Sequence, residues 1–168
     1  VLSGGNFHGE PIGQVMDFVS ITVSELAAIS ERRTFRLLDD KLSGGLPPML
    51  VDQLRDAGLN SGLMMPQYTA ASLVLENQTL ATPDSVHSLP TSGEQEDHNA
   101  NSLTAAVHAS RIIQNTIRVV GIELYTASRA LDLRLRAHPT LKMGRGTRRV
   151  YEKIRAVVPY RAGDTLWA

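Results

Sequence analysis

Apolar residues recur along this chain three and four positions apart, which is the period of one face of an α-helix. The first stripe follows Glu10-Pro11, where proline suits the first helical turn, and it predicts a helix over residues 11–38. We expect this stripe to be buried, and it consists of Ile12, Met16, Val19, Val23 and Leu26. A loop rich in glycine and proline at residues 43–48 then ends the helix.

Further helices are predicted over residues 49–57, 61–81, 92–136 and 147–158. The start at residue 92 rests on two overlapping capping boxes, in which Thr91 and Ser92 are followed three residues later by Glu94 and Gln95. These patterns predict an all-α chain that forms a single helical unit over residues 1–168.

The helix predicted over residues 92–136 is unusually long for a small domain. A helix of roughly forty residues spans about 60 Å. Its apolar positions keep a near-heptad spacing from Leu103 to Leu135, with no proline before Pro139. We therefore expect much of this stripe to be buried against other helices or other subunits.

Composition narrows the class of protein. With 168 residues, 42% of them hydrophobic, and a formal net charge of zero, the chain has a globular composition and no general attraction to nucleic acid. No run approaches eighteen uninterrupted apolar residues, so no membrane span is expected. The absence of cysteine excludes disulfides, thiolate metal sites and a cysteine nucleophile. Because the chain starts at Val1, with neither methionine nor a signal peptide, we expect a fragment, a processed product or one piece of a nicked chain.

A few polar residues could carry chemistry. The pairs His8-x-Glu10 and Glu96-x-His98 could ligate a metal, but they lack the two-histidine helical pattern of zinc hydrolases, so no metal is expected. The carboxylates near residue 96 would favour a helix start, or one of them, Glu96, could move a proton or hold a substrate amine. Phe7, in a glycine-rich loop, could anchor a core or contact a ligand. The residue pattern leaves these alternatives open.

Ordered motifs then add a resemblance to a known family. The stretch Ser3-Gly4-Gly5-Asn6-Phe7-His8-Gly9-Glu10-Pro11 resembles the Gly-Gly-Asn-Phe-His-x-Glu-Pro signature of the aromatic amino acid ammonia-lyases, in its histidine ammonia-lyase form. Further motifs follow in order up to about residue 100: Ser30-Glu31-Arg32-Arg33, Leu46-Pro47-Pro48, Asn60-Ser61-Gly62, Gln67-x-Thr69-Ala70-Ala71, Glu76-Asn77, and Ser88-Leu89-Pro90-Thr91-Ser92-x-x-Gln95-Glu96-Asp97-His98.

The resemblance implies the C-terminal portion of a long-helix bundle of the ammonia-lyase and fumarase type. It implies a carbon–nitrogen lyase that removes ammonia from L-histidine to give trans-urocanate, through a 4-methylideneimidazol-5-one electrophile. The family forms that group from an Ala-Ser-Gly triad, and this chain contains no such triad. Thr91-Ser92-Gly93 resembles the triad only superficially, because its first residue is threonine. The triad is therefore expected upstream of Val1, and the chain alone is expected to be inactive.

Carried over by position, the resemblance implies that Glu96 is catalytic and that Phe7 and Gln95 bind the substrate. It implies no cofactor-binding residue and no metal ligand in this chain. It also implies a cytoplasmic homotetramer of histidine catabolism, completed by the N-terminal portion of the same protein, with no membrane or nucleic-acid partner. Two alternatives stay open: a phenylalanine or tyrosine ammonia-lyase or aminomutase of the same family, and a non-catalytic helical oligomerisation module.

Overall fold

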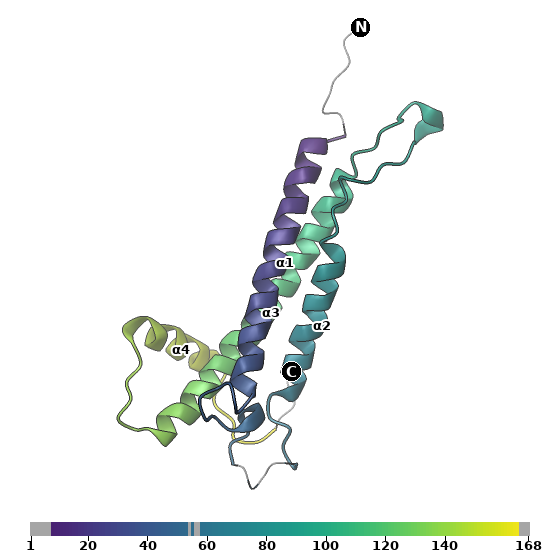
Figure 1. Ribbon diagram of the computed structural model, residues 1–168. Helices are drawn as coiled ribbons and strands as arrows, with labels where there is room; N and C mark the ends of the chain where they lie inside the picture. The colour runs from purple at the N-terminus through teal and green to yellow at the C-terminus, as the bar shows by residue number, and fades with distance from the viewer. Residues whose placement is uncertain (1–7, 54, 56–57, 165–168) are drawn as a thin grey trace. The chain divides into compact units, whose positions relative to one another are not determined.

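The computed structural model describes residues 8–53, 55 and 58–164, and their regular structure is helical. The elements are α1 (Glu10–Leu38), α2 (Met64–Leu80), α3 (Ser102–Ala137) and α4 (Arg145–Val157), with short 3-10 turns η1 (Pro48–Leu50) and η3 (Ser92–Glu94) (Figure 1). No strand longer than an isolated bridge occurs in these residues. The all-α prediction is confirmed.

Helices α1, α2 and α4 begin and end within three residues of the predicted bounds 11–38, 61–81 and 147–158. The α-helix expected over residues 49–57 is wrong for its described part, which contains the end of the turn η1 and no α-helical residue. Met49 and Leu50 there have φ values of 53° and 54°, in the left-handed region that a right-handed helix excludes.

The predicted start of the longest helix at residue 92 is also wrong, because α3 begins at Ser102. Ser92, Gly93 and Glu94 have φ values of 50°, 60° and 67°, which do not fit an α-helix. The Thr91 side chain makes no capping hydrogen bond to the backbone and donates instead to the Glu96 carboxylate. The pattern that predicted two capping boxes therefore belongs to a turn.

By their internal contacts the residues form two compact units. The first contains residues 1–28 and 72–118, and the second contains residues 29–71 and 119–168. The single helical unit expected for residues 1–168 stays a prediction.

The interior of the first unit is lined by small and polar side chains. Gly13 brings α1 close to the start of α3, since a Cβ there would lie 3.3 Å from the Ala100 carbonyl oxygen. Buried Asn77 donates to the Thr116 hydroxyl at 3.2 Å and accepts from the Asn115 amide at 3.0 Å. Other buried residues of this interior are Ser20, Ser24, Ala27, Ala105 and Ala109.

Many large apolar residues of the first unit face outward, although Ile112 is fully buried. Ile12 and Leu26, which were expected in the core, are 57% and 56% exposed, and Phe18 is 70% exposed. On α3, Leu103 and Val107 are 77% and 57% exposed. The prediction that the first stripe is buried is therefore wrong for Ile12 and Leu26, whereas Met16, Val19 and Val23 are half-buried.

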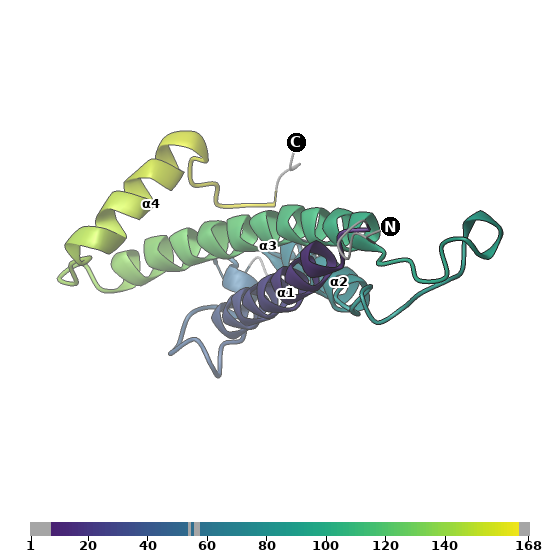
Figure 2. The ribbon, with the colours of Figure 1, turned by 90° about the horizontal axis from the view of Figure 1, so that it is seen from above.

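The second unit has an apolar core and a buried arginine. The core consists of Leu38, Leu46, Leu50, Leu63, Ala130 and Leu133. Arg129 is 3% exposed, and its guanidinium donates to the carbonyl oxygens of Leu50, Arg161 and Ala162. Helix α4 turns back from the end of α3 (Figures 1 and 2). Its Tyr151 and Arg155 bind the Asp132 carboxylate.

By length and composition alone, α1 could cross a membrane, with a mean hydropathy of 1.4 over eighteen residues. The core helix of a soluble protein passes the same test, but such a helix is mostly buried, whereas 28% of this eighteen-residue window is buried. Two polar side chains of α1, Asp17 and Ser20, are buried inside the first unit, at 6% and 2% exposure. A carboxylate buried with its hydrogen bonds shows that this face of α1 packs inside the first unit.

Candidate functional site

The segment between α2 and α3 carries Gln95 and Glu96, and it leaves α2 and returns to α3 as two paired arms (Figures 1 and 2). All of it lies in the first unit. The first arm is anchored on α1, where the Asp17 carboxylate accepts the backbone N–H groups of Asp84 at 3.1 Å and Ser85 at 2.9 Å. His108 of α3 adds a contact of 2.8 Å between its Nδ1 and the Asp84 carboxylate.

These contacts set the ionisation of Asp17. Burial by itself would raise the pKa of this carboxyl, but hydrogen bonds from Ser85 and Asp84 and the nearby His108 hold its pKa below the ordinary value of 3.8. Asp17 is therefore a carboxylate at neutral pH, and its charge strengthens both backbone hydrogen bonds.

The two arms are also bound to each other. The Asn101 side-chain amide donates to the His87 carbonyl oxygen at 2.7 Å, and the Asn99 backbone N–H donates to the Ser88 hydroxyl at 2.9 Å. Asn101 precedes α3 directly, so the same residue joins the returning arm to the outgoing arm and to the helix start.

At the tip, Thr91 and Glu96 exchange two backbone hydrogen bonds, at 2.8 and 3.3 Å. The intervening turn places three consecutive residues in the left-handed region, and glycine at position 93 adopts that conformation without cost. The turn thereby fixes the backbone on which the Glu96 side chain stands.

The Glu96 carboxylate lies beside the segment that precedes α1. Its Oε2 accepts the Thr91 hydroxyl at 3.1 Å and lies 3.8 Å from His8 Nε2. A second pair lies between His98 and the first residue of α1, with His98 Nε2 at 3.9 Å from Glu10 Oε2. The Glu96 side chain is 36% exposed, so a molecule in solution can reach it.

The position of His8 is fixed by its backbone. The Ser102 hydroxyl donates to the His8 carbonyl oxygen at 2.7 Å. Gly9 follows with φ of 72°, and a Cβ there would lie 3.0 Å from the Ser102 Oγ. Glycine at position 9 thus permits the close approach that ties this segment to the start of α3.

The three expected site residues have different outcomes. Glu96 has defined partners and is partly exposed, whereas the Gln95 side chain is exposed at the turn. Phe7 lies outside the described residues. Its neighbour His8 is the residue that the structure brings to Glu96. The roles of Phe7, Gln95 and Glu96 stay predictions.

In chemical terms, a carboxylate held on one oxygen by a hydroxyl and near an imidazole can accept a proton or bind an ammonium group. Within the described part of the chain, no group of three or more His, Asp or Glu side chains is placed to hold a metal ion. The two His/Glu motifs considered as metal pairs in the sequence form cross-linking pairs instead.

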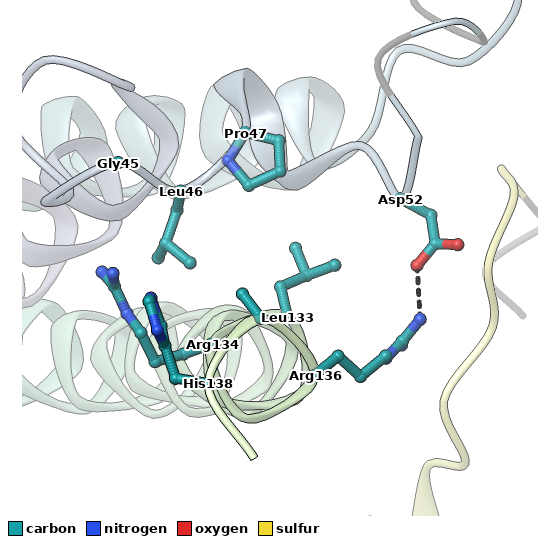
Figure 3. A pocket seen from close by; sticks show the side chains of 9 residues that line it. Gly45, Leu46, Pro47, Asp52, Leu133, Arg134, Arg136 and His138 are labelled. Carbon is teal, nitrogen blue, oxygen red and sulfur yellow. Dashed lines mark hydrogen bonds and ion pairs between the residues drawn. The ribbon is translucent and has the colours of Figure 1, made fainter. Parts of the chain in front are cut away.

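A cavity of about 400 Å³ lies elsewhere, in the second unit. Figure 3 shows Arg134 and His138 on one side of its apolar floor, and Arg136, paired with Asp52 at 2.8 Å, on the other. The Arg134 guanidinium already donates to the carbonyl oxygens of Ser43 and Gly44. Gln95 and Glu96 do not line this cavity.

Sequence reasoning missed the residues that hold the candidate site in place. Asp17 lies in an otherwise apolar stretch of α1, and a lone carboxylate at such a position was a usable signal of a specific partner. His108 gave no signal, because an isolated histidine on a helix has many roles. The matched spacing of His8-x-Glu10 and Glu96-x-His98 is visible in the sequence, but which residues pair across the chain depends on the fold.

Known proteins resemble this chain over nearly all of its length. The family model for aromatic amino acid lyases matches residues 1–156. The chain is 48% identical over 164 residues to a histidine ammonia-lyase of Natranaerobius thermophilus, covering 98% of this chain and 31% of that protein. It is 51% identical over 155 residues to a histidine ammonia-lyase of Treponema denticola, covering 92% and 29%.

Solved structures agree with the fold. A histidine ammonia-lyase from Trypanosoma cruzi matches with a TM-score of 0.88 at 40% identity, over 99% of this chain and 31% of that one. A tyrosine aminomutase from Streptomyces globisporus matches with a TM-score of 0.88 at 36% identity, over 97% and 30%. The chain therefore spans about a third of the length of the relatives that it matches, and it belongs to the aromatic amino acid lyase family.

Proposed function

We propose that this chain is part of an ammonia-lyase that eliminates ammonia from L-histidine to give trans-urocanate. The observation that carries the proposal is the anchored, partly exposed carboxylate of Glu96, in a chain 48–51% identical to histidine ammonia-lyases. The source protein that contains this chain is called the complete enzyme below. That the chain is its C-terminal portion stays a prediction.

In this proposal Glu96 meets the substrate at its amino group or side chain, with Phe7 and Gln95 beside it. Elimination of ammonia needs a group that takes up a proton and groups that orient the amine as it leaves. Glu96 Oε2 is engaged by Thr91 and lies near His8, so Oε1 is the oxygen for the substrate. A carboxylate held in this way loses little freedom when it binds an ammonium group.

The electrophile in this proposal is 4-methylideneimidazol-5-one, formed in polypeptide outside this chain. When present, it activates the substrate amine as a leaving group. The chain has no Ala-Ser-Gly triad to form it, but the exposed Glu96 carboxylate fits a site in which a second segment faces the same substrate.

We also propose a cytoplasmic homotetramer of histidine catabolism. The support is physical, because α1 and α3 expose large apolar side chains that would otherwise contact water. The most exposed of them are Phe18 at 70%, Leu103 at 77% and Ile117 at 66%. Burial of such faces between subunits, or against the rest of the complete enzyme, stabilises the assembly.

The test is a spectrophotometric assay of the complete enzyme with L-histidine, following urocanate absorbance, beside assays with L-phenylalanine and L-tyrosine. Activity with histidine alone supports the proposal. Activity with an aromatic substrate, or formation of a β-amino acid, would assign the phenylalanine or tyrosine lyases or aminomutases instead. An assembled enzyme inactive on all three would refute it.

The role of Glu96 has its own test. The change Glu96→Gln keeps the size of the side chain and removes its basicity, so we expect kcat to fall by about 10²-fold or more. The matched control is Glu94→Gln, two positions away in the same turn, where the side chain is exposed. Equal kinetics for wild type and Glu96→Gln would reduce Glu96 to a structural carboxylate.

A second candidate is a non-catalytic helical oligomerisation module. The exposed apolar faces of α1 and α3, together with the absence of the triad, favour it for the chain alone. An intact-mass measurement of the source protein distinguishes the two. A mature species near 18.3 kDa with no companion polypeptide would support the module, whereas a larger chain or a partner containing Ala-Ser-Gly would support the enzyme.

A further inference from the structure

Two His/Glu pairs join the loop of Glu96 to residues 8–10, which lead into the first turn of α1. His8 faces Glu96 across 3.8 Å, and His98 faces Glu10 across 3.9 Å. Each segment contributes one imidazole and one carboxylate, so a potential cation meets an anion at both positions. Such crossed pairing favours one register between the two segments.

The two pairs differ in what else holds their members. His8 is tied through its carbonyl oxygen to Ser102, at the start of α3. Glu96 stands on the Thr91–Glu96 bridge, and its Oε2 also accepts the Thr91 hydroxyl. The first pair therefore joins two groups whose backbones are already fixed.

The geometry leaves the two carboxylate oxygens of Glu96 in different surroundings. Oε2 has the Thr91 hydroxyl and the His8 imidazole within ion-pair or hydrogen-bond distance. Oε1 has no hydrogen-bond partner within the part of the chain that the structure describes. Contacts on a single oxygen set the rotation of the carboxylate and the direction in which the other oxygen points.

We propose that His8 is a positioning residue for the ammonia-lyase reaction: with Thr91, it holds Glu96 by Oε2 and turns Oε1 toward the substrate. This inference rests on the proposed function, since it takes Glu96 as the group that meets the substrate. His8 acts only through Glu96, so its removal affects the reaction by displacing that carboxylate. The reciprocal pair of Glu10 and His98 keeps the two segments in register.

The test is a double-mutant cycle in the complete enzyme, with His8→Leu, Glu96→Gln and the double variant. Displacement of a group by about 1 Å can cost about 10²-fold in rate, so we expect His8→Leu to lower kcat by roughly 10- to 100-fold and to change KM less. In the Glu96→Gln background the same change should cost less than about threefold, because coupled residues are not additive.

Conservative variants and a control separate positioning from general damage. His8→Gln keeps an N–H donor near the position of Nε2 and should recover most of kcat, whereas the shorter His8→Asn should not. His87→Leu removes an exposed histidine from the same loop and should leave kcat unchanged. If His8→Leu fails to assemble, as judged by gel filtration, the comparison of His8→Gln with His8→Asn decides the question.

The outcomes distinguish this inference from the function on which it rests. Wild-type activity on histidine and its loss in Glu96→Gln test the proposed function without involving His8. Given both results, full additivity of His8→Leu and Glu96→Gln would overturn the positioning role. Equal kcat values for wild type, His8→Gln and His8→Asn would overturn it as well.

Discussion

Replacement of Asp17 is the most direct test of how the loop of Glu96 is anchored. The carboxylate is 6% exposed and accepts the backbone N–H groups of Asp84 and Ser85. A hydrogen bond to a charged group contributes about 1.5–3 kcal/mol. Asp84 and Ser85 are half-buried, so water replaces part of each bond, and we take about 2–3 kcal/mol for both together.

This loss can be measured locally by amide hydrogen exchange of the complete enzyme, followed by mass spectrometry of peptides covering residues 82–90. Since about 1.4 kcal/mol corresponds to a tenfold change, Asp17→Ala should speed exchange of the Asp84 and Ser85 amides by about 30- to 140-fold. Asp17→Asn retains an acceptor without the charge and should give a smaller increase. Glu25→Ala, at an exposed position of the same helix, is the matched control.

The stabilisation that Asp17 gives to this loop depends on pH with a defined sign. The folded pKa of Asp17 lies below its ordinary value of 3.8, so its contribution is complete above that value and is lost as pH falls through the lower folded pKa. Exchange in Asp17→Asn should lack this acid dependence. The anchoring role would be refuted if, at neutral pH, the two amides of Asp17→Ala exchanged at rates within twofold of the wild-type rates.

Three other changes test the packing of the two units. Asn77→Ala, at a fully buried residue bonded to Asn115 and Thr116, should lower the free energy of unfolding by about 2–4 kcal/mol, measured by chemical denaturation beside the exposed control Gln78→Ala. Arg129→Lys keeps the charge but cannot reach three carbonyl oxygens, so trypsin should cleave after Arg161 several times faster than in wild type. Gly62→Ala places a Cβ 2.3 Å from the Met49 carbonyl oxygen at φ of 61° and should lower the melting temperature by several degrees, whereas Gly146→Ala, with open space around it, should not.

The helical class and most helix bounds follow from local rules. Periodic apolar residues, and Pro11 in a first turn, act through the backbone near them, so the sequence alone determined α1, α2 and α4 to within a few residues. The start of α3 did not follow, because Thr91, Ser92 and Glu94 fit a capping box and a turn equally well. The turn forms because contacts along the loop stabilise it: Thr91 pairs with Glu96, and Asn101 pairs with His87.

Which helix face is buried was decided only by the tertiary structure. The hydrophobic period locates a stripe, but it does not say whether that stripe faces the same chain or another one. Here Gly13, Ser20 and Ala105 form the contact between helices, while Ile12 and Leu103 face outward. Small residues allow helices to approach closely, and the large apolar residues are left for contacts beyond this chain.

The candidate site divides in the same way. The sequence determined the identity of Glu96 as a candidate, because a motif needs only neighbouring residues in order. Its pairing with His8, and the anchoring of its loop by Asp17 and His108, join residues distant along the chain. Such contacts form when helices bring remote segments together, and so only the folded structure decided which groups hold that carboxylate.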